Sequence, residues 1–223
     1  MAVDRLLVWR GVDPDRVDAA RVTLHDDRLH ARGTSLAPDH TVTWRLVTGP
    51  GWTTRVLDVR TVPAGDDAGA ADRDDADADA DAGADDGGRR LVLRRDDAGR
   101  WSGRRWVDGR VVAADLPDPA ELAGALDCDL GLCPLTNTMP VLRSGLLDRA
   151  DRTVRFTVAW VSVPDLTVHV AVQDYGPAER LPSGGAVVHF DSDGFTADLT
   201  VDREGLVVSY PGIADRITDR IGP

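Results

Sequence analysis

Apolar and polar residues alternate with a period of two along much of this chain. The clearest runs are 41–46, 154–160, 166–173 and 195–202. A segment in which every second side chain is apolar forms a strand with one buried face. Turn residues separate the runs, and Asp108-Gly109 and Asp193-Gly194 supply the positive φ that tight hairpins need. The sequence therefore predicts an all-β protein built mainly from antiparallel hairpins.

Two short helices are expected beside the strands. One covers residues 118–126, where Pro119 follows a capping Asp118, and the other covers residues 213–221. Segment 127–140, in contrast, is predicted not to be helical. Pro134 and Pro140 lack a backbone donor and push the residue before them toward extended geometry. Because this segment also holds buriable leucines, we expect it to line or close an internal space.

The length of 223 residues fits one large all-β domain. Residues 64–88 depart from the rest, with ten aspartates, Arg73 and otherwise only alanine and glycine. Such a segment buries too little apolar surface to offset its ordering entropy, so we expect a disordered acidic insert. It separates the strand-like runs 53–62 and 90–95, which predicts a long hairpin connection within a single domain, 1–223.

Composition excludes several classes of function. The net charge of −12 argues against a nucleic-acid partner. No apolar run reaches the roughly 18 residues of a membrane-spanning helix, and the first residues lack the basic and apolar regions of a secretory signal, so a cytoplasmic protein is expected. Cys128 and Cys133 are too few for a disulfide framework and are expected to be free thiols. The five histidines are scattered, so neither a metal nor another cofactor is predicted.

Tryptophan is unusually frequent. The six tryptophans outnumber tyrosine and phenylalanine together. They lie at Trp9, Trp44, Trp52, Trp101, Trp106 and Trp160. In a large sheet wrapped on itself, tryptophans either fill the core or line a cavity for an amphiphile, where the indole offers apolar area and one donor. The sequence leaves both readings open.

One extended motif carries a family resemblance. It consists of Asp127-x-Asp129-Leu130, followed by Pro134-x-Thr136-Asn137-Thr138-x-Pro140-x-x-Arg143. Supporting elements are Leu7-Val8-Trp9-Arg10, Gly51-Trp52-Thr53, Gly99-Arg100-Trp101, Ala159-Trp160, Pro164, Gln173-x-Tyr175, Gly194-Phe195 and Tyr210-Pro211-Gly212. Over nearly its whole length except the insert, the chain resembles the bacterial family described as putative glycolipid-binding proteins. Cys133 departs from the family pattern, because a small hydroxyl residue is expected there.

The resemblance implies a fold and a function. The implied fold is a spiral β-roll, a single curled antiparallel sheet like a half-open barrel, with a hydrophobic hollow similar to that of periplasmic carriers of lipidated proteins. The implied function is non-catalytic binding of an amphiphilic small molecule, a glycolipid or another lipid. From residue chemistry and resemblance together, the expected ligand-binding residues are Trp9, Trp52, Trp101 and Trp160 in the walls, with Thr136, Asn137 and Arg143 near the opening.

Two alternatives remain at this stage. In the first, the interior is filled by side chains, Asn137 and its threonine neighbours satisfy backbone groups, and the protein is a structural or partner-binding module. In the second, Asp127 and Asp129 project from one face of a strand and act as the acid and base of a hydrolase. Against catalysis, the two acids can equally form a structural ion network with Arg143 or Arg149, and no other catalytic motif accompanies them.

Overall fold

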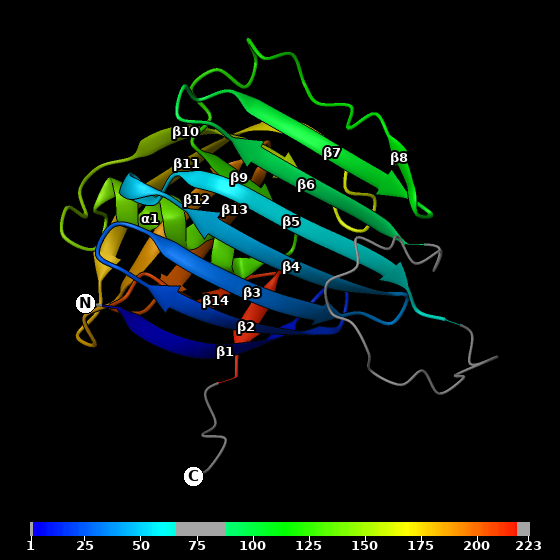
Figure 1. The fold of residues 1–223 in the computed structure, drawn as a ribbon. Helices are drawn as coiled ribbons and strands as arrows, with labels where there is room; N and C mark the ends of the chain where they lie inside the picture. The colour runs from blue at the N-terminus through cyan, green and yellow to red at the C-terminus, as the bar shows by residue number, and fades with distance from the viewer. Residues whose placement is uncertain (1, 66–87, 218–223) are drawn as a thin grey trace.

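A single coiled sheet dominates the computed structural model, which describes residues 2–65 and 88–217 (Figure 1). Its strands are β1 (Val3–Gly11), β2 (Arg16–Leu24), β3 (Leu29–Leu36), β4 (His40–Thr48), β5 (Thr54–Pro63), β6 (Arg89–Arg95), β7 (Trp101–Val107), β8 (Arg110–Val112), β9 (Asp127–Leu130), β10 (Val154–Val161), β11 (Val168–Arg180), β12 (Ala186–Ser192), β13 (Phe195–Val201), β14 (Val207–Tyr210) and β15 (Ala214–Arg216). The predicted all-β class and the single open, curled sheet are confirmed.

Strand order follows the chain except at one seam. The order is β8-β7-β6-β5-β4-β3-β2-β1-β15-β14-β13-β12-β11-β10-β9. The first half therefore runs as a meander from β8 back to β1, and β15 then joins β1 to the second half through the pairs from Trp9↔Arg216 to Gly11↔Ala214. The predicted Asp-Gly turns are present, since both residues of Asp108-Gly109 and of Asp193-Gly194 have positive φ.

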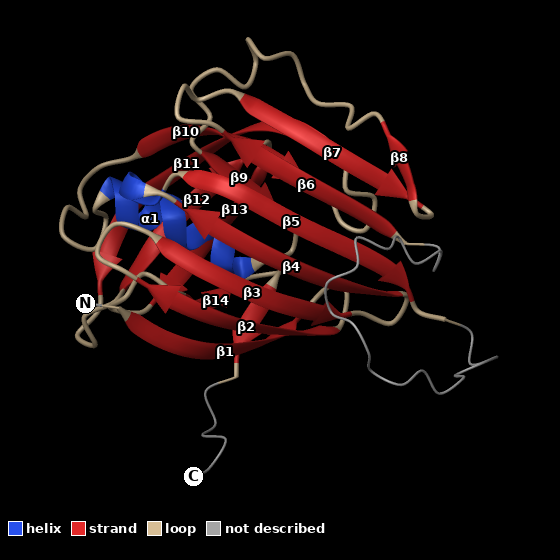
Figure 2. Cartoon of the chain, viewed as in Figure 1, coloured by secondary structure: helices blue, strands red, loops and turns tan. Residues whose placement is uncertain are grey.

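The sheet is antiparallel apart from its last pair. β9 runs parallel to β10. Parallel neighbours require a crossover connection, and here the crossover contains the 3-10 helix η2 (Pro134–Asn137) and the helix α1 (Thr138–Ser144). Figure 2 shows this helical segment enclosed between the two halves of the sheet.

The coil closes where β9 meets β5. The Thr54 amide donates to the Leu126 carbonyl at 2.9 Å, and the Thr54 hydroxyl accepts from the Cys128 amide at 2.9 Å. Both Thr54 and Cys128 are buried. The edge of the sheet is thereby attached to its middle, so the sheet encloses an interior without forming a closed ladder there.

The enclosed interior holds two apolar clusters. Leu135 and Met139 belong to the first, together with Trp9 and the inward side chains of β1–β6. Val141 and Leu146 belong to the second, which is formed mainly by β11–β14 and contains Tyr175, Phe190 and Tyr210. The crossover helix thus packs against both halves of the sheet.

The helix predictions were wrong in three places. Residues 119–124 form consecutive turns instead of a helix, and they end at Gly124, which has φ +84°. Asp118 does accept the Ala120 amide as a cap. Residues 214–216 form β15, which fills the gap between β1 and β14, and residues 218–221 lie outside the described residues. Segment 127–140 does contain helix, since Pro134 and Pro140 occupy first-turn positions, where no intrahelical donor is required.

The expected long hairpin is present around the acidic insert. β5 and β6 are antiparallel neighbours, from Val56↔Arg94 to Thr61↔Arg89. The expected disorder of 64–88 concerns residues 66–87, which lie outside the described residues. The assignment of 1–223 to a single domain stays a prediction.

Thr54→Val should lower the free energy of unfolding by about 1–3 kcal/mol, because the buried Cys128 amide loses its acceptor. Urea unfolding monitored by tryptophan fluorescence measures the change. Thr53→Val is the matched control, since the Thr53 hydroxyl donates to the Pro50 carbonyl at an exposed site. Equal losses in the two variants would contradict the role given to Thr54.

Candidate ligand-binding cavity

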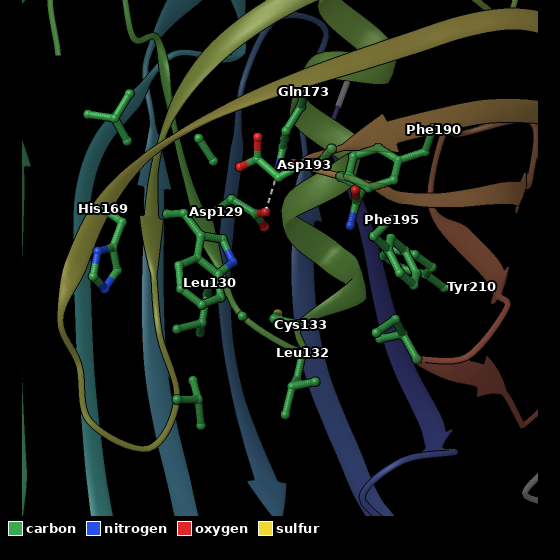
Figure 3. Close-up of a pocket in the computed structure, with 18 residues that line it drawn as sticks. Asp129, Leu130, Leu132, Cys133, His169, Gln173, Phe190, Asp193, Phe195 and Tyr210 are labelled. Carbon is green, nitrogen blue, oxygen red and sulfur yellow. Dashed lines mark hydrogen bonds between the residues drawn. The ribbon is translucent and has the colours of Figure 1, made fainter. Parts of the chain in front are cut away.

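The roll contains a cavity of about 630 Å³ (Figure 3). Its lining comes from the end of β9 and the following loop (residues 129–133), from β10 and β11, from the β12–β13 hairpin, and from Asn137, Tyr210 and Ile213. Small-molecule sites in proteins usually have volumes of roughly 300–1,000 Å³. The cavity is therefore large enough for a ligand. The interior of the roll is not completely filled by side chains.

Aromatic side chains form two opposite walls of this cavity. Phe190, Phe195 and Tyr210 contact one another with ring centroids 5.8–6.3 Å apart. On the other side, the rings of Trp160 and His169 lie 5.7 Å apart. Figure 3 shows His169 facing the phenylalanine and tyrosine rings across the cavity. Phe195 is 40% exposed, so the first wall extends to the opening.

The inner end of the cavity is polar. The Asp129 carboxylate accepts from the Thr136 hydroxyl and from Gln173 Nε2, both at 2.6 Å. The Tyr175 hydroxyl donates to Asn137 Oδ1 at 2.8 Å and lies 3.2 Å from Gln173 Oε1. Asn137, Gln173 and Tyr175 are buried, which places this network at depth. We call Asp129, Thr136, Asn137, Gln173 and Tyr175 the inner network.

Burial controls the protonation of the inner network. It raises the pKa of Asp129, the hydrogen bonds from Thr136 and Gln173 oppose the rise, and the nearby Asp127 charge adds to it. Burial also raises the pKa of Tyr175 well above its ordinary value. Tyr175 therefore stays a neutral donor at physiological pH.

Asp127, two residues before Asp129, has a different partner. Arg143 from α1 donates to both Asp127 oxygens, to Oδ1 at 2.9 Å and to Oδ2 in a shorter contact. The guanidinium also lies 4.9 Å from the centroid of the Phe156 ring. Burial raises the pKa of Asp127, and the hydrogen bond and charge of Arg143 oppose that rise. The expected ion network thus exists as an Asp127–Arg143 pair, behind the cavity.

The structure brings together only part of the predicted site. Trp160 and Asn137 line the cavity, whereas Thr136 and Arg143 lie behind its surface as the partners of Asp129 and Asp127. The other three tryptophans pack elsewhere. Trp9 is buried and donates to the Val207 carbonyl, Trp101 donates to the Ala125 carbonyl, and Trp52 is buried in the first apolar cluster. None of these three tryptophans is among the residues that line the cavity, because each indole packs or donates a hydrogen bond elsewhere in the protein.

Sequence reasoning missed most of the actual walls. His169 and Ala171 lie on the polar side of the alternation in 166–173, and Phe190 lies outside the runs from which strands were predicted. Gln173-x-Tyr175, Gly194-Phe195 and Tyr210-Pro211-Gly212, which belong to the family resemblance, did contain residues of this region. The family elements were therefore a better guide than tryptophan content.

The remaining reactive groups give no catalytic set. Both cysteines are free, and burial raises the pKa of Cys128 to about 12 and raises that of Cys133 as well. Within residues 2–65 and 88–217 no group of three or more histidine, cysteine, aspartate or glutamate side chains could hold a metal ion. In the same part of the chain, no helix is long and apolar enough to cross a membrane.

An open, coiled sheet that encloses a helix and a cavity defines a half-open β-roll protein. The family model described as putative glycolipid-binding matches residues 76–216, so the chain belongs to that family. A crystal structure of a DUF1089 family protein from Pseudomonas aeruginosa has the same fold. The two share 24% identity with a TM-score of 0.58, over 90% of this chain and 92% of the other. No curated protein matches the chain.

Arg143→Met should lower the free energy of unfolding by about 3–5 kcal/mol, because it leaves the buried Asp127 carboxylate without its partner. Urea unfolding at neutral pH measures the loss. Arg149→Met, at an exposed position six residues away, is the control and should change stability little. The double variant Asp127→Asn/Arg143→Met should recover part of the loss, and no recovery would contradict the pairing.

Asp129→Asn should alter how stability depends on pH. The folded-state pKa of Asp129 is raised above its ordinary value of 3.8, so the folded protein holds this proton more tightly than the unfolded chain does. The wild type should therefore lose stability, relative to the Asn variant, as pH rises from about 3.8 through the folded-state pKa. Urea unfolding across a pH series measures the difference. Parallel curves would contradict a raised pKa.

Proposed function

We propose that the protein binds an amphiphilic small molecule, a lipid or glycolipid, within the cavity of the roll, without catalysing a reaction on it. The observation that supports this most is the cavity of about 630 Å³, which opens on one side and is lined mainly by apolar and aromatic side chains with a few polar groups. Small-molecule sites have this size and this mixture of lining residues.

The two ends of the cavity suit the two ends of an amphiphile. The walls offer Phe190, Phe195, Tyr210 and Trp160 to an alkyl chain, and each buried methylene contributes about 0.8 kcal/mol. The inner network offers Asp129 and Asn137 to a polar headgroup. Among the residues predicted from sequence, Trp160 and Asn137 are kept as proposed ligand contacts. The description of the family as glycolipid-binding agrees with this assignment.

The positions of Asp127 and Asp129 favour binding over hydrolysis. A glycosidase needs two carboxyl groups on either side of the scissile bond. Here Asp127 is buried in its pair with Arg143, and only Asp129 lines the cavity. A second acid, Asp193, lies at the exposed end among the lining residues, on the β12–β13 turn. The paired-acid mechanism expected from the Asp127-x-Asp129 spacing therefore has one of its two acids outside the cavity.

Filling the cavity should abolish binding. Ala171→Phe places a ring in the cavity and should weaken binding of octyl glucoside at least about tenfold, or about 1.4 kcal/mol. Isothermal titration calorimetry below the critical micelle concentration measures the affinity. Val172→Phe is the matched control, because Val172 is the next residue and is 41% exposed.

Two results would count against the proposal. To test ligands other than octyl glucoside, protein purified from its native host is also extracted with organic solvent, and the extract is analysed by mass spectrometry. An absence of amphiphile in the extract, together with no measurable octyl glucoside binding, would contradict a lipid-binding role. Equal weakening by the two phenylalanine variants would place any binding elsewhere.

A further inference from the structure

We propose that this cavity selects amphiphiles whose headgroup donates hydrogen bonds and carries no negative charge, with Asp129 as the group that accepts from the headgroup. The inference rests on the proposed function, and it adds a chemical class of ligand to it. Phosphate- and sulfate-bearing amphiphiles are excluded, whereas uncharged polyol headgroups are accepted.

The charges of the lining point to this selection. The chain has 26 basic residues, all of them arginine, yet none of the described residues lining the cavity is an arginine. The lining contains two aspartates, Asp129 and Asp193, and one histidine, His169. A protein site for phosphate normally presents arginine, lysine or free backbone amides. This lining presents two carboxyls instead.

Arg143 and Arg16, which contact residues next to the cavity lining, are paired with aspartates. Arg143 is bound to Asp127 through both of its terminal nitrogens. Arg16, beside the loop that follows β9, pairs with Asp18 at 3.1 Å and donates to the Leu132 carbonyl at 2.7 Å. Both guanidinium groups are therefore paired with a carboxylate, and neither is among the residues that line the cavity.

The donors at the inner end are partly occupied. Gln173 Nε2 donates to Asp129, Asn137 Nδ2 donates to the Pro134 carbonyl at 3.3 Å, and the Tyr175 hydroxyl donates to Asn137. The hydroxyl has no further hydrogen, and each of the two amide nitrogens keeps one. An anionic headgroup would therefore meet few neutral donors here, beside a carboxylate of like charge.

Asp129, in contrast, has acceptor capacity left. An ionised carboxylate offers about four lone-pair positions, and the inner network uses two of them. No ion pair joins Asp129 to an arginine or histidine within the described part of the chain. Its charge is balanced only by two neutral donors, so hydroxyl groups of a ligand would strengthen that balance. Its half-buried side chain lies on the cavity surface, where a ligand can reach it.

Two probes with the same tail test the selection. Octyl glucoside and octyl phosphate are titrated separately into the full-length protein at pH 8, below their critical micelle concentrations. The wild type should bind octyl glucoside at least about a hundredfold more tightly than octyl phosphate, a difference of about 2.7 kcal/mol. Similar affinities for the two probes would overturn the inference and leave the proposed function standing. Binding of neither probe would count against the proposed function itself.

Variants assign the selection to Asp129. Asp129→Asn keeps the shape and removes the charge, so the glucoside-to-phosphate ratio should fall at least about tenfold. Asp193→Asn, at the exposed end, is the matched control and should change the ratio much less. An unchanged ratio in Asp129→Asn, or an equal change in both variants, would overturn the role of Asp129.

A third variant keeps the test independent of the inner network. Ser192→Arg adds a cation to the cavity lining without touching Asp129 or its partners. If the anionic lining causes the exclusion, this variant should gain affinity for octyl phosphate by at least about tenfold. No gain in a variant that unfolds at the wild-type temperature would contradict an electrostatic origin of the selection.

Discussion

Two hydrogen bonds of Thr54, one through its amide and one through its side chain, attach the β9 region to β5 and so enclose the interior of the roll. Thr54 bonds the Leu126 carbonyl through its amide and the Cys128 amide through its hydroxyl. An open sheet of this size would otherwise leave its β9 edge unpaired. By attaching that edge to the middle of the sheet, Thr54 turns an open meander into an enclosure. The crossover from β9 to β10 must then pass through the enclosure, and it carries α1 into it. The cavity is the part of the enclosed space that α1 leaves unfilled.

The two acids of the Asp127-x-Asp129 motif have different surroundings. Both acids are on the same short strand, but Arg143 from α1 reaches only the first. Asp127 therefore fastens α1 to the edge of the sheet, whereas Asp129 borders the cavity with only neutral donors around it. Arg143 pairs with Asp127 alone, and this pairing is what distinguishes the two acids. The segment Pro134–Arg143 forms most of the crossover, and it contributes Thr136 and Asn137 to the inner network.

The sequence was informative wherever the relevant interaction was local. Alternation identified the strands, and Asp108-Gly109 and Asp193-Gly194 identified two of the turns, because both properties depend on neighbouring residues alone. The helices were assigned poorly for a related reason. Proline opposes a helix only beyond the first turn of that helix. Pro134 begins η2 and Pro140 lies in the first turn of α1, and local sequence did not predict where these two helices begin.

The candidate site was predictable only in part, because a cavity is defined by contacts between distant strands. Trp160 and Trp9 have the same chemistry and similar sequence surroundings, yet one borders the cavity and the other bonds Val207 across the β1–β14 region. Asn137 was found through its family motif. Phe190 and Tyr210, twenty residues apart, became visible as a wall only when β12 and β14 were placed together.

The position of β15 in the sheet has a consequence for how the protein is made. β1 gains its second neighbour only when β15, far away in the sequence, pairs with it. Tyr210 and Ile213, which line the cavity, lie just before β15. Non-local pairing of this kind forms late and slowly. The cavity is therefore completed only after the strands on both sides of this seam have been synthesised and have paired.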